Sequence, residues 1–133
     1  MVEKFLDGVH VVVVDDELGP REVYREALAE AGARVTTAAS AREALAAIER
    51  ELPHVLVSDI RMPGEDGYWL IEAVRAVRKD SRRPRTLAIT GDPRRNPRTV
   101  VCEAGYDVHL GKPVTIETLR VVVGRLAGRF SIT

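Results

Sequence analysis

Short apolar runs recur along this chain, and helical patterns separate them. The runs cover residues 9–14, 55–57, 87–89 and 108–110, while residues 34–38 alternate between polar and apolar as an edge strand does. Parallel strands that are covered by helices on both faces read as nearly continuous apolar runs. The pattern therefore predicts an α/β fold, a doubly wound sheet of five parallel strands that alternate with five helices.

Capping and breaking residues define the predicted helices. Pro20 is expected to open the first helix with Val23 among its inward residues, and Ser40 with Glu43 forms a capping box at the second. The apolar stripe of the last helix is expected to begin at Ile116. The predicted helices span residues 21–31, 41–52, 66–79, 98–104 and 116–128. No repeat or linker interrupts this pattern, so we expect one domain over residues 1–133.

Five residues of chemical interest stand just beyond four of the apolar runs. In chain order they are Asp15, Asp16, Asp59, Thr90 and Lys112. In an open α/β sheet, ligands bind in a crevice outside the carboxyl ends of the strands. We therefore expect three carboxylates, one hydroxyl and one ammonium group to meet at one edge of the sheet.

The three carboxylates define the chemistry of this crevice. Crowded carboxylates repel one another and are tolerated best when a cation neutralises them, and Mg²⁺ suits such a site because it also pairs with phosphate oxygens. One Asp could then attack a phosphorus centre, while Lys112 offsets the charge of the phosphoryl group and Thr90 donates a hydrogen bond to it. Singly, each residue also fits a helix cap or a turn. Jointly, at one end of one sheet, they favour a metal-dependent phosphorylation site.

Three short motifs surround these residues, and with Asp15-Asp16 they resemble the receiver domain of two-component response regulators. The motifs are Asp59-Ile60-Arg61-Met62-Pro63 with Asp66-Gly67, Thr90-Gly91, and Lys112-Pro113. The resemblance covers about residues 8–128 and implies a flavodoxin-like fold with strand order 2-1-3-4-5. It implies that Asp59 accepts a phosphoryl group, which Thr90 and Lys112 contact. The Mg²⁺ ligands it implies are Asp15, Asp16, Asp59 and the backbone carbonyl of Arg61.

The resemblance implies a signalling switch and not an enzyme with an external substrate. In this family a histidine kinase, a histidine phosphotransfer protein or a small acyl phosphate supplies the phosphoryl group, and the receiver catalyses only its own aspartyl phosphorylation and dephosphorylation. One alternative is a phosphate-independent interaction module, although such receivers commonly lose an acidic residue. Another is a phosphotransferase or phosphatase of the dehalogenase-like type, but its Asp-x-Asp signature is missing, because Asp59 is followed by Ile60 and Arg61.

His109 departs from the receiver pattern. The family usually has Tyr or Phe three residues before the lysine of the fifth strand, where the aromatic ring moves together with the threonine, so here the switch pair is Thr90 and His109. A histidine at this place resembles the receiver modules of hybrid histidine kinases and indicates a phosphorelay. The ring is expected either to pack as an ordinary side chain or to respond to pH near neutrality.

Composition limits the partners and the compartment. Lys+Arg and Asp+Glu both number 20, so there is no electrostatic reason to expect nucleic-acid or membrane binding, and the basic stretch between residues 75 and 98 reads as a solvated helix end and loop. The longest apolar run is too short to span a bilayer, and we expect no secretory signal. Cys102 is the only cysteine, which fits the reducing cytoplasm.

One surface is a candidate for docking a partner or for a homodimer. It combines the fourth helix, the fifth strand and the fifth helix, where Val100, Val101 and Val121 widen the apolar area. Valines in amphipathic helices that only pack inward explain the same pattern.

Overall fold

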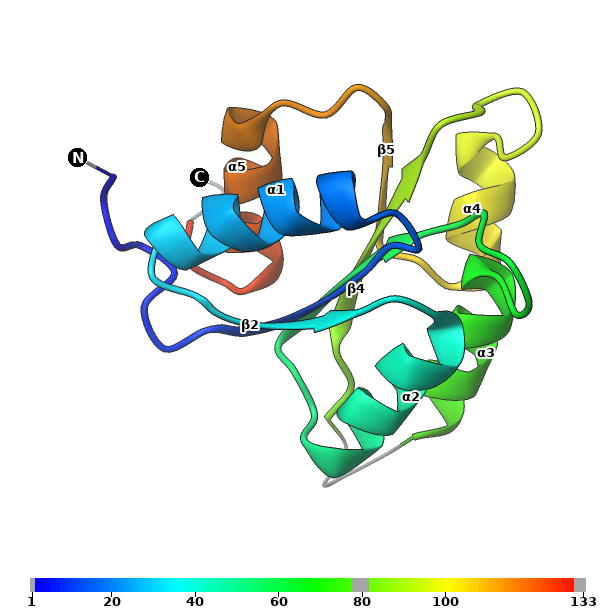
Figure 1. The fold of residues 1–133 in the computed structure, drawn as a ribbon, viewed down its shortest axis with the longest axis horizontal. Helices are drawn as coiled ribbons and strands as arrows, with labels where there is room; N and C mark the ends of the chain where they lie inside the picture. The colour runs from blue at the N-terminus through cyan, green and yellow to red at the C-terminus, as the bar shows by residue number, and fades with distance from the viewer. Residues whose placement is uncertain (1, 78–81, 131–133) are drawn as a thin grey trace.

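The computed structural model describes residues 2–77 and 82–130 and shows a parallel five-stranded sheet with the order β2-β1-β3-β4-β5 (Figure 1). The strands are β1 (His10–Val14), β2 (Arg34–Ala38), β3 (Val55–Asp59), β4 (Arg85–Thr90) and β5 (Val108–Gly111). The helices are α1 (Leu18–Glu30), α2 (Ala41–Arg50), α3 (Gly67–Ala76), α4 (Arg98–Ala104) and α5 (Ile116–Leu126). The predicted flavodoxin-like, doubly wound fold and its strand order are confirmed.

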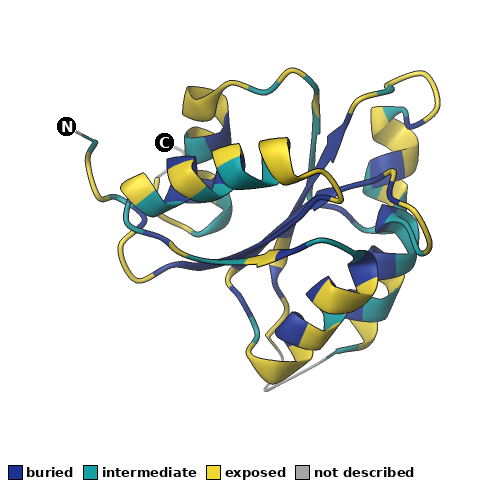
Figure 2. Cartoon of the chain, viewed as in Figure 1, coloured by how far each residue is buried: buried dark blue, intermediate teal, exposed yellow. Residues whose placement is uncertain are grey.

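The helices cover both faces of the sheet, with α1 and α5 on one side and α2, α3 and α4 on the other (Figure 1). Residues of β1 show how the pleat divides the core. Val11 and Val13 pack toward α1 and α5, whereas Val12 and Val14 pack toward α2 and α3. All five residues of β1 and of β3 are buried, which is why the central strands are dark in Figure 2. The continuous apolar runs are therefore strands buried on both faces.

The first helix begins earlier than predicted. It starts at Leu18, so Pro20 lies within its first turn, where a missing N–H breaks no hydrogen bond inside the helix. Val23 was expected to face inward but is 49% exposed, and Tyr24 is buried in its place. Tyr24, Ala27 and Leu28 have the i, i+3, i+4 spacing of one helix face, and Val23 lies outside that stripe.

Two other helices also differ from the prediction. Ile116 is 40% exposed, because the inward residues of α5 are Leu119 and Val123 with Gly124. At Gly124 an added Cβ would lie 2.3 Å from the Phe130 ring, so the rings of Phe130 and Phe5 pack where a side chain would stand. The third helix was predicted to reach residue 79 but ends at Ala76, because Val77 has an extended backbone; residues 78–79 lie outside the described residues.

The predicted N-cap of the second helix is confirmed. Ser40 caps α2, its Oγ accepting the Glu43 N–H at 3.2 Å. Within residues 2–77 and 82–130, no helix has the length and apolar character needed to cross a bilayer.

Candidate acidic phosphorylation site

The strands bring the predicted site residues to one edge of the sheet. Asp15 and Asp16 follow β1 directly, Asp59 and Thr90 are the last residues of β3 and β4, and Lys112 follows β5. In the parallel register Asp59 lies opposite Ile89, and Thr90 lies opposite Gly111. All five residues therefore meet at the carboxyl ends of the strands, as the fold prediction required.

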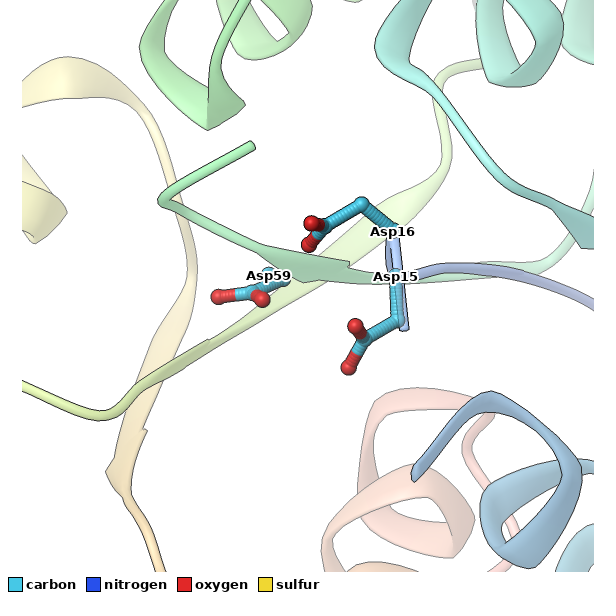
Figure 3. A group of neighbouring side chains, drawn as sticks. All are labelled: Asp15, Asp16 and Asp59. Carbon is cyan, nitrogen blue, oxygen red and sulfur yellow. The ribbon is translucent and has the colours of Figure 1, made fainter. Parts of the chain in front are cut away.

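The three carboxylates form one cluster, drawn in Figure 3. An oxygen from each of Asp15, Asp16 and Asp59 lies within 4.8 Å of the oxygens from the other two. Asp15 is 1% exposed and Asp59 is 7% exposed, whereas Asp16 is exposed to solvent. The cluster thus has two buried members and one member at its mouth.

Asp15 is held by the start of α1. Its Oδ1 accepts the backbone N–H of Glu17 at 2.9 Å, and its carbonyl oxygen accepts a hydrogen bond from Nη1 of Arg21 at 2.8 Å. These contacts fix both the backbone and the carboxylate of Asp15.

The loop after Asp59 is held by the start of α3. The N–H of Gly67 donates to the carbonyl of Ile60 at 2.8 Å. A Cβ on Gly67 would lie 2.8 Å from the carbonyl oxygen of Asp59 and 2.8 Å from Cα of Ile60, so only glycine permits this approach. Asp66 caps the helix by accepting the N–H groups of residues 68 and 69 at 3.0 and 2.9 Å.

Tyr106, to which the sequence analysis gave no role, contacts the start of α3 next to the loop after Asp59. It is 2% exposed, and its hydroxyl donates to the carbonyl of Gly67 at 2.7 Å. The two residues are 39 positions apart, so no local pattern could reveal this contact. The position of α3 relative to the acidic cluster therefore depends on Tyr106, which lies two residues before the fifth strand.

Lys112 supplies the cation of the cluster. Its Nζ lies 3.6 Å from Oδ2 of Asp59 and 3.9 Å from Oδ2 of Asp15, and its side chain is 26% exposed. The backbone N–H of Lys112 donates to the carbonyl of Thr90 at 2.7 Å, and the Lys112–Pro113 peptide bond is cis. The ammonium group therefore reaches both buried carboxylates from the end of β5.

The cluster carries more negative charge than Lys112 balances. Burial raises the pKa of Asp59 above its ordinary value; Lys112 opposes that shift and Asp15 adds to it. Burial likewise raises the pKa of Asp15, against the Glu17 N–H and Lys112. Burial alone would lower the pKa of Lys112, but Asp59 and Asp15 outweigh it and leave that pKa raised. Two carboxylates that resist ionisation beside a firmly protonated lysine form an electrostatic setting in which a further cation would be stabilising.

The donor set fits Mg²⁺. All three converging groups offer carboxylate oxygens, the hard ligands this ion prefers, and the exposed Asp16 leaves the site open to the waters that Mg²⁺ retains. The predicted fourth ligand, the carbonyl of Arg61, lies in the loop that Gly67 holds against β3. A pocket of about 440 Å³ borders this loop and is lined by Arg61, Met62, Pro63, Gly64 and Asp66.

Thr90 and His109, the predicted switch pair, are in direct contact. Thr90 is 1% exposed, and its Oγ1 lies 3.0 Å from Nε2 of His109. Burial lowers the pKa of His109, and the positive charge of Arg98 lowers it further. The ring is therefore part of the site's hydrogen-bond network.

The fold and this site together define the class of protein. Residues 11–124 match the family model of the response regulator receiver domain, and the chain belongs to that family. Receiver domains are the signalling modules of two-component systems.

Particular relatives agree with this assignment. The chain is 42% identical, over 88% of its length and 89% of the relative's, to an uncharacterized 14.6 kDa protein from the sodA1 3' region of Leptolyngbya boryana. It is 31% identical, over 92% of its length, to response regulator Rre1 of Synechocystis, of which it spans only 53%. Among solved structures, the receiver domain of sensor histidine kinase PA1611 from Pseudomonas aeruginosa has 28% identity and a TM-score of 0.82, covering 91% of this chain and 98% of that one. That crystal structure has a magnesium ion coordinated in its active site cleft.

Proposed function

We propose that this chain is a phosphoacceptor switch, which takes a phosphoryl group onto Asp59 from a histidine kinase or a histidine phosphotransfer protein. The observation that carries the proposal is the buried Asp59 carboxylate, clustered with Asp15 and Asp16 and 3.6 Å from the ammonium group of Lys112. Such a setting combines a nucleophile with the charges that a transferred phosphoryl group needs.

Asp59 is the acceptor that the geometry favours among the three carboxylates. One oxygen of Asp15 is bound to the N–H of Glu17, and that side chain is almost fully buried. Asp16 is exposed, and the ammonium group of Lys112 lies nearest to Asp59, at 3.6 Å, against 3.9 Å for Asp15. Asp59 also ends the central strand of the sheet, between the residues on β1 and those on β4 and β5.

The chain's own residues then have distinct tasks. An oxygen of Asp59 attacks the phosphorus atom, and the bond from phosphorus to the donor's nitrogen or oxygen breaks. Asp15, Asp16, Asp59 and the carbonyl of Arg61 would hold Mg²⁺, which when bound neutralises charge on the phosphoryl oxygens. Lys112 exchanges its ion pair with Asp59 for a phosphoryl oxygen, and Thr90 donates its hydroxyl hydrogen to another.

The wider function follows from the family. Receiver domains interact with histidine kinases or phosphotransfer proteins, and phosphorylation changes the face they present to partners. The histidine at position 109 and the likeness to a receiver from a sensor histidine kinase support a phosphorelay setting in the cytoplasm. The chain spans about half the length of Rre1, so the activity of any longer protein that contains it is part of this proposal.

The predicted docking face is only partly apolar. Val100 on α4 and Val121 on α5 are 47% and 39% exposed, whereas Val101 is buried against the sheet. We propose this face for partner binding or homodimer formation after phosphorylation, with Val100 and Val121 as its apolar residues.

The intact mass after incubation with acetyl phosphate tests the acceptor assignment. We expect one added phosphoryl group that requires both Mg²⁺ and Asp59, with Asp59→Asn taking none and the exposed-site control Asp7→Asn taking the wild-type amount. Addition to Asp59→Asn would contradict the assignment. No addition from either acetyl phosphate or a phosphorylated histidine phosphotransfer protein would favour the second candidate, a receiver-like module that binds partners without phosphate.

A further inference from the structure

The hydrogen bond between Thr90 and His109 joins two side chains on the same face of the sheet. His109 lies directly opposite Ala88 in the parallel register, and Thr90 is two residues beyond Ala88 on β4. Side chains two positions apart along a strand point to the same face, so the hydroxyl and the ring are diagonal neighbours. The separation of 3.0 Å between Oγ1 and Nε2 is a full hydrogen bond and not merely a packing contact.

The number of hydrogens in this bond limits what Thr90 can do. A threonine hydroxyl has one hydrogen to donate, and each nitrogen of a neutral imidazole either carries a hydrogen or accepts one. If Nε2 accepts, the hydroxyl hydrogen of Thr90 is used by His109. If Nε2 carries the hydrogen, it donates to Oγ1 and the hydroxyl hydrogen stays free. Both arrangements fit the same separation of the two heavy atoms.

We infer that His109 is a positioning residue that gates Thr90: the hydrogen on Nε2 decides whether Thr90 can donate to a phosphoryl oxygen on Asp59. This inference rests on the proposed function, because the gate has meaning only if Asp59 accepts a phosphoryl group. A phenylalanine ring at this position has no nitrogen to accept the hydrogen and would leave Thr90 ungated. The gate is thus a property of the histidine itself.

The surroundings of the His109 ring determine how the hydrogen on Nε2 depends on pH. Burial and the charge of Arg98 on α4 lower the pKa of His109, so the ring is uncharged near neutrality and Nε2 can accept. Two other charged groups near the ring in sequence are already paired. Asp107 accepts hydrogen bonds from the N–H and hydroxyl of Thr86, and the ammonium group of Lys112 lies 3.6 Å from Asp59 and 3.9 Å from Asp15. Protonation places a hydrogen on both ring nitrogens, which forces Nε2 to donate and releases the hydroxyl. The gate therefore opens as the pH falls below the pKa of His109.

Phosphorylation rates in matched variants test the gate. Initial rates with acetyl phosphate and Mg²⁺ would be measured from about pH 5.5 to 8 for the wild type and His109→Phe, since the ratio of the two rates cancels the titration of the phosphoryl donor and of the acidic cluster. At pH 8 we expect His109→Phe to be about two- to tenfold faster, the range that one net hydrogen bond supplies. The ratio should approach one at the acid end. In a Thr90→Ala background, the same replacement should have no pH-dependent effect.

Two further measurements keep the test decisive. Histidine ¹⁵N NMR reports which ring nitrogen carries hydrogen, and we expect Nε2 protonation to increase when beryllofluoride and Mg²⁺ mimic the phosphorylated state. His109→Gln also cannot titrate at this position, so the ratio of its rate to that of the wild type should likewise change with pH, and it replaces His109→Phe if the latter does not fold. A constant wild-type to His109→Phe ratio, or a difference that persists without Thr90, would overturn the gate alone. Absence of phosphoryl addition at every pH, from acetyl phosphate and from a phosphorylated histidine phosphotransfer protein alike, would remove the proposed function, and the gate with it.

Discussion

Replacing Asp59 with Asn should stabilise the metal-free protein, because the buried charge costs more than its ion pair returns. At an effective dielectric constant of about 20, the 3.6 Å pair with Lys112 contributes about 4.6 kcal/mol of attraction. At the 4.8 Å limit of the cluster, the repulsion from Asp15 is about 3.5 kcal/mol. The exposed Asp16 at the same separation adds about 0.9 kcal/mol under solvent screening. Attraction and repulsion therefore cancel to within about 1 kcal/mol.

The cost of burying the carboxylate decides the sign. Asp59 is 7% exposed, and removing a charge from water costs several kcal/mol before compensation. Lys112 is not left alone in the variant, since Asp15 remains 3.9 Å from its Nζ. We expect Asp59→Asn to raise the free energy of unfolding by about 1–2 kcal/mol in EDTA at pH 7. For 133 residues this corresponds to an increase of about 4–7 °C in Tm.

The gain should depend on pH in a defined direction. The pKa of Asp59 is raised in the folded protein, so between the ordinary Asp pKa and the raised value the folded protein binds a proton that the unfolded chain has released. Wild-type stability therefore falls as the pH rises through that window, whereas Asn has no proton to lose. The difference between variant and wild type should be small near pH 4 and larger at pH 7.

Thermal unfolding in EDTA at both pH values measures this difference. Asp7→Asn is the matched control, because Asp7 is exposed and the same chemical change there should shift stability by no more than about 0.5 kcal/mol. An unchanged or lower midpoint for Asp59→Asn at pH 7 would refute the repulsion argument. A gain of equal size at both pH values would show that packing, and not charge, is responsible.

Three further predictions concern residues that hold the site. Lys112→Ala removes the cation shared by Asp15 and Asp59. The metal-free variant should therefore lose about 2–4 kcal/mol of unfolding free energy and regain most of it in Mg²⁺. Equal losses with and without Mg²⁺ would contradict this prediction. Gly67→Ala places a Cβ 2.8 Å from the carbonyl oxygen of Asp59, which should displace the loop after Asp59. We expect titration calorimetry to show the Mg²⁺ affinity reduced by about tenfold or more. An unchanged affinity would mean that the site tolerates displacement of this loop. Tyr106→Phe leaves the carbonyl of Gly67 without its donor and should cost about 1–3 kcal/mol in urea unfolding, which an unaltered midpoint would disprove.

The central strands were predictable because strands that are buried on both faces have nearly continuous apolar sequences. The edge strand β2 and the short helix α4 have the predicted bounds. The orientation of α1 was not predictable in the same way, because Val23 and Tyr24 are neighbours and both can be buried. Only the packing of α1 against the sheet decides between them, and that depends on residues distant in sequence.

The site was predictable to the extent that its residues end strands. The carboxyl ends of parallel strands converge whatever the connecting loops do, which is why Asp15, Asp59 and Thr90 could be placed together. The hydrogen bond from Tyr106 to Gly67 could not be predicted, because every residue has a backbone carbonyl and the type of the accepting residue therefore does not indicate the bond. The glycine itself was the available signal, since its lack of a side chain allows the close approach to Asp59.

The hydrogen bonds around the site also determine which elements can move when Asp59 is phosphorylated. The hydroxyl of Tyr68, in the first turn of α3, donates to Oδ1 of Asn96 at 2.8 Å, and Asn96 is 6% exposed. This bond ties the loop after Thr90 to α3, so a shift of Thr90 toward the phosphoryl group cannot be absorbed by that loop without breaking a buried contact. The imidazole of His109 is hydrogen-bonded to the Thr90 hydroxyl at 3.0 Å, so the ring is coupled to any shift of that hydroxyl. The displacement should therefore pass to β5 and to the neighbouring α4, where the exposed Val100 belongs to the proposed docking face.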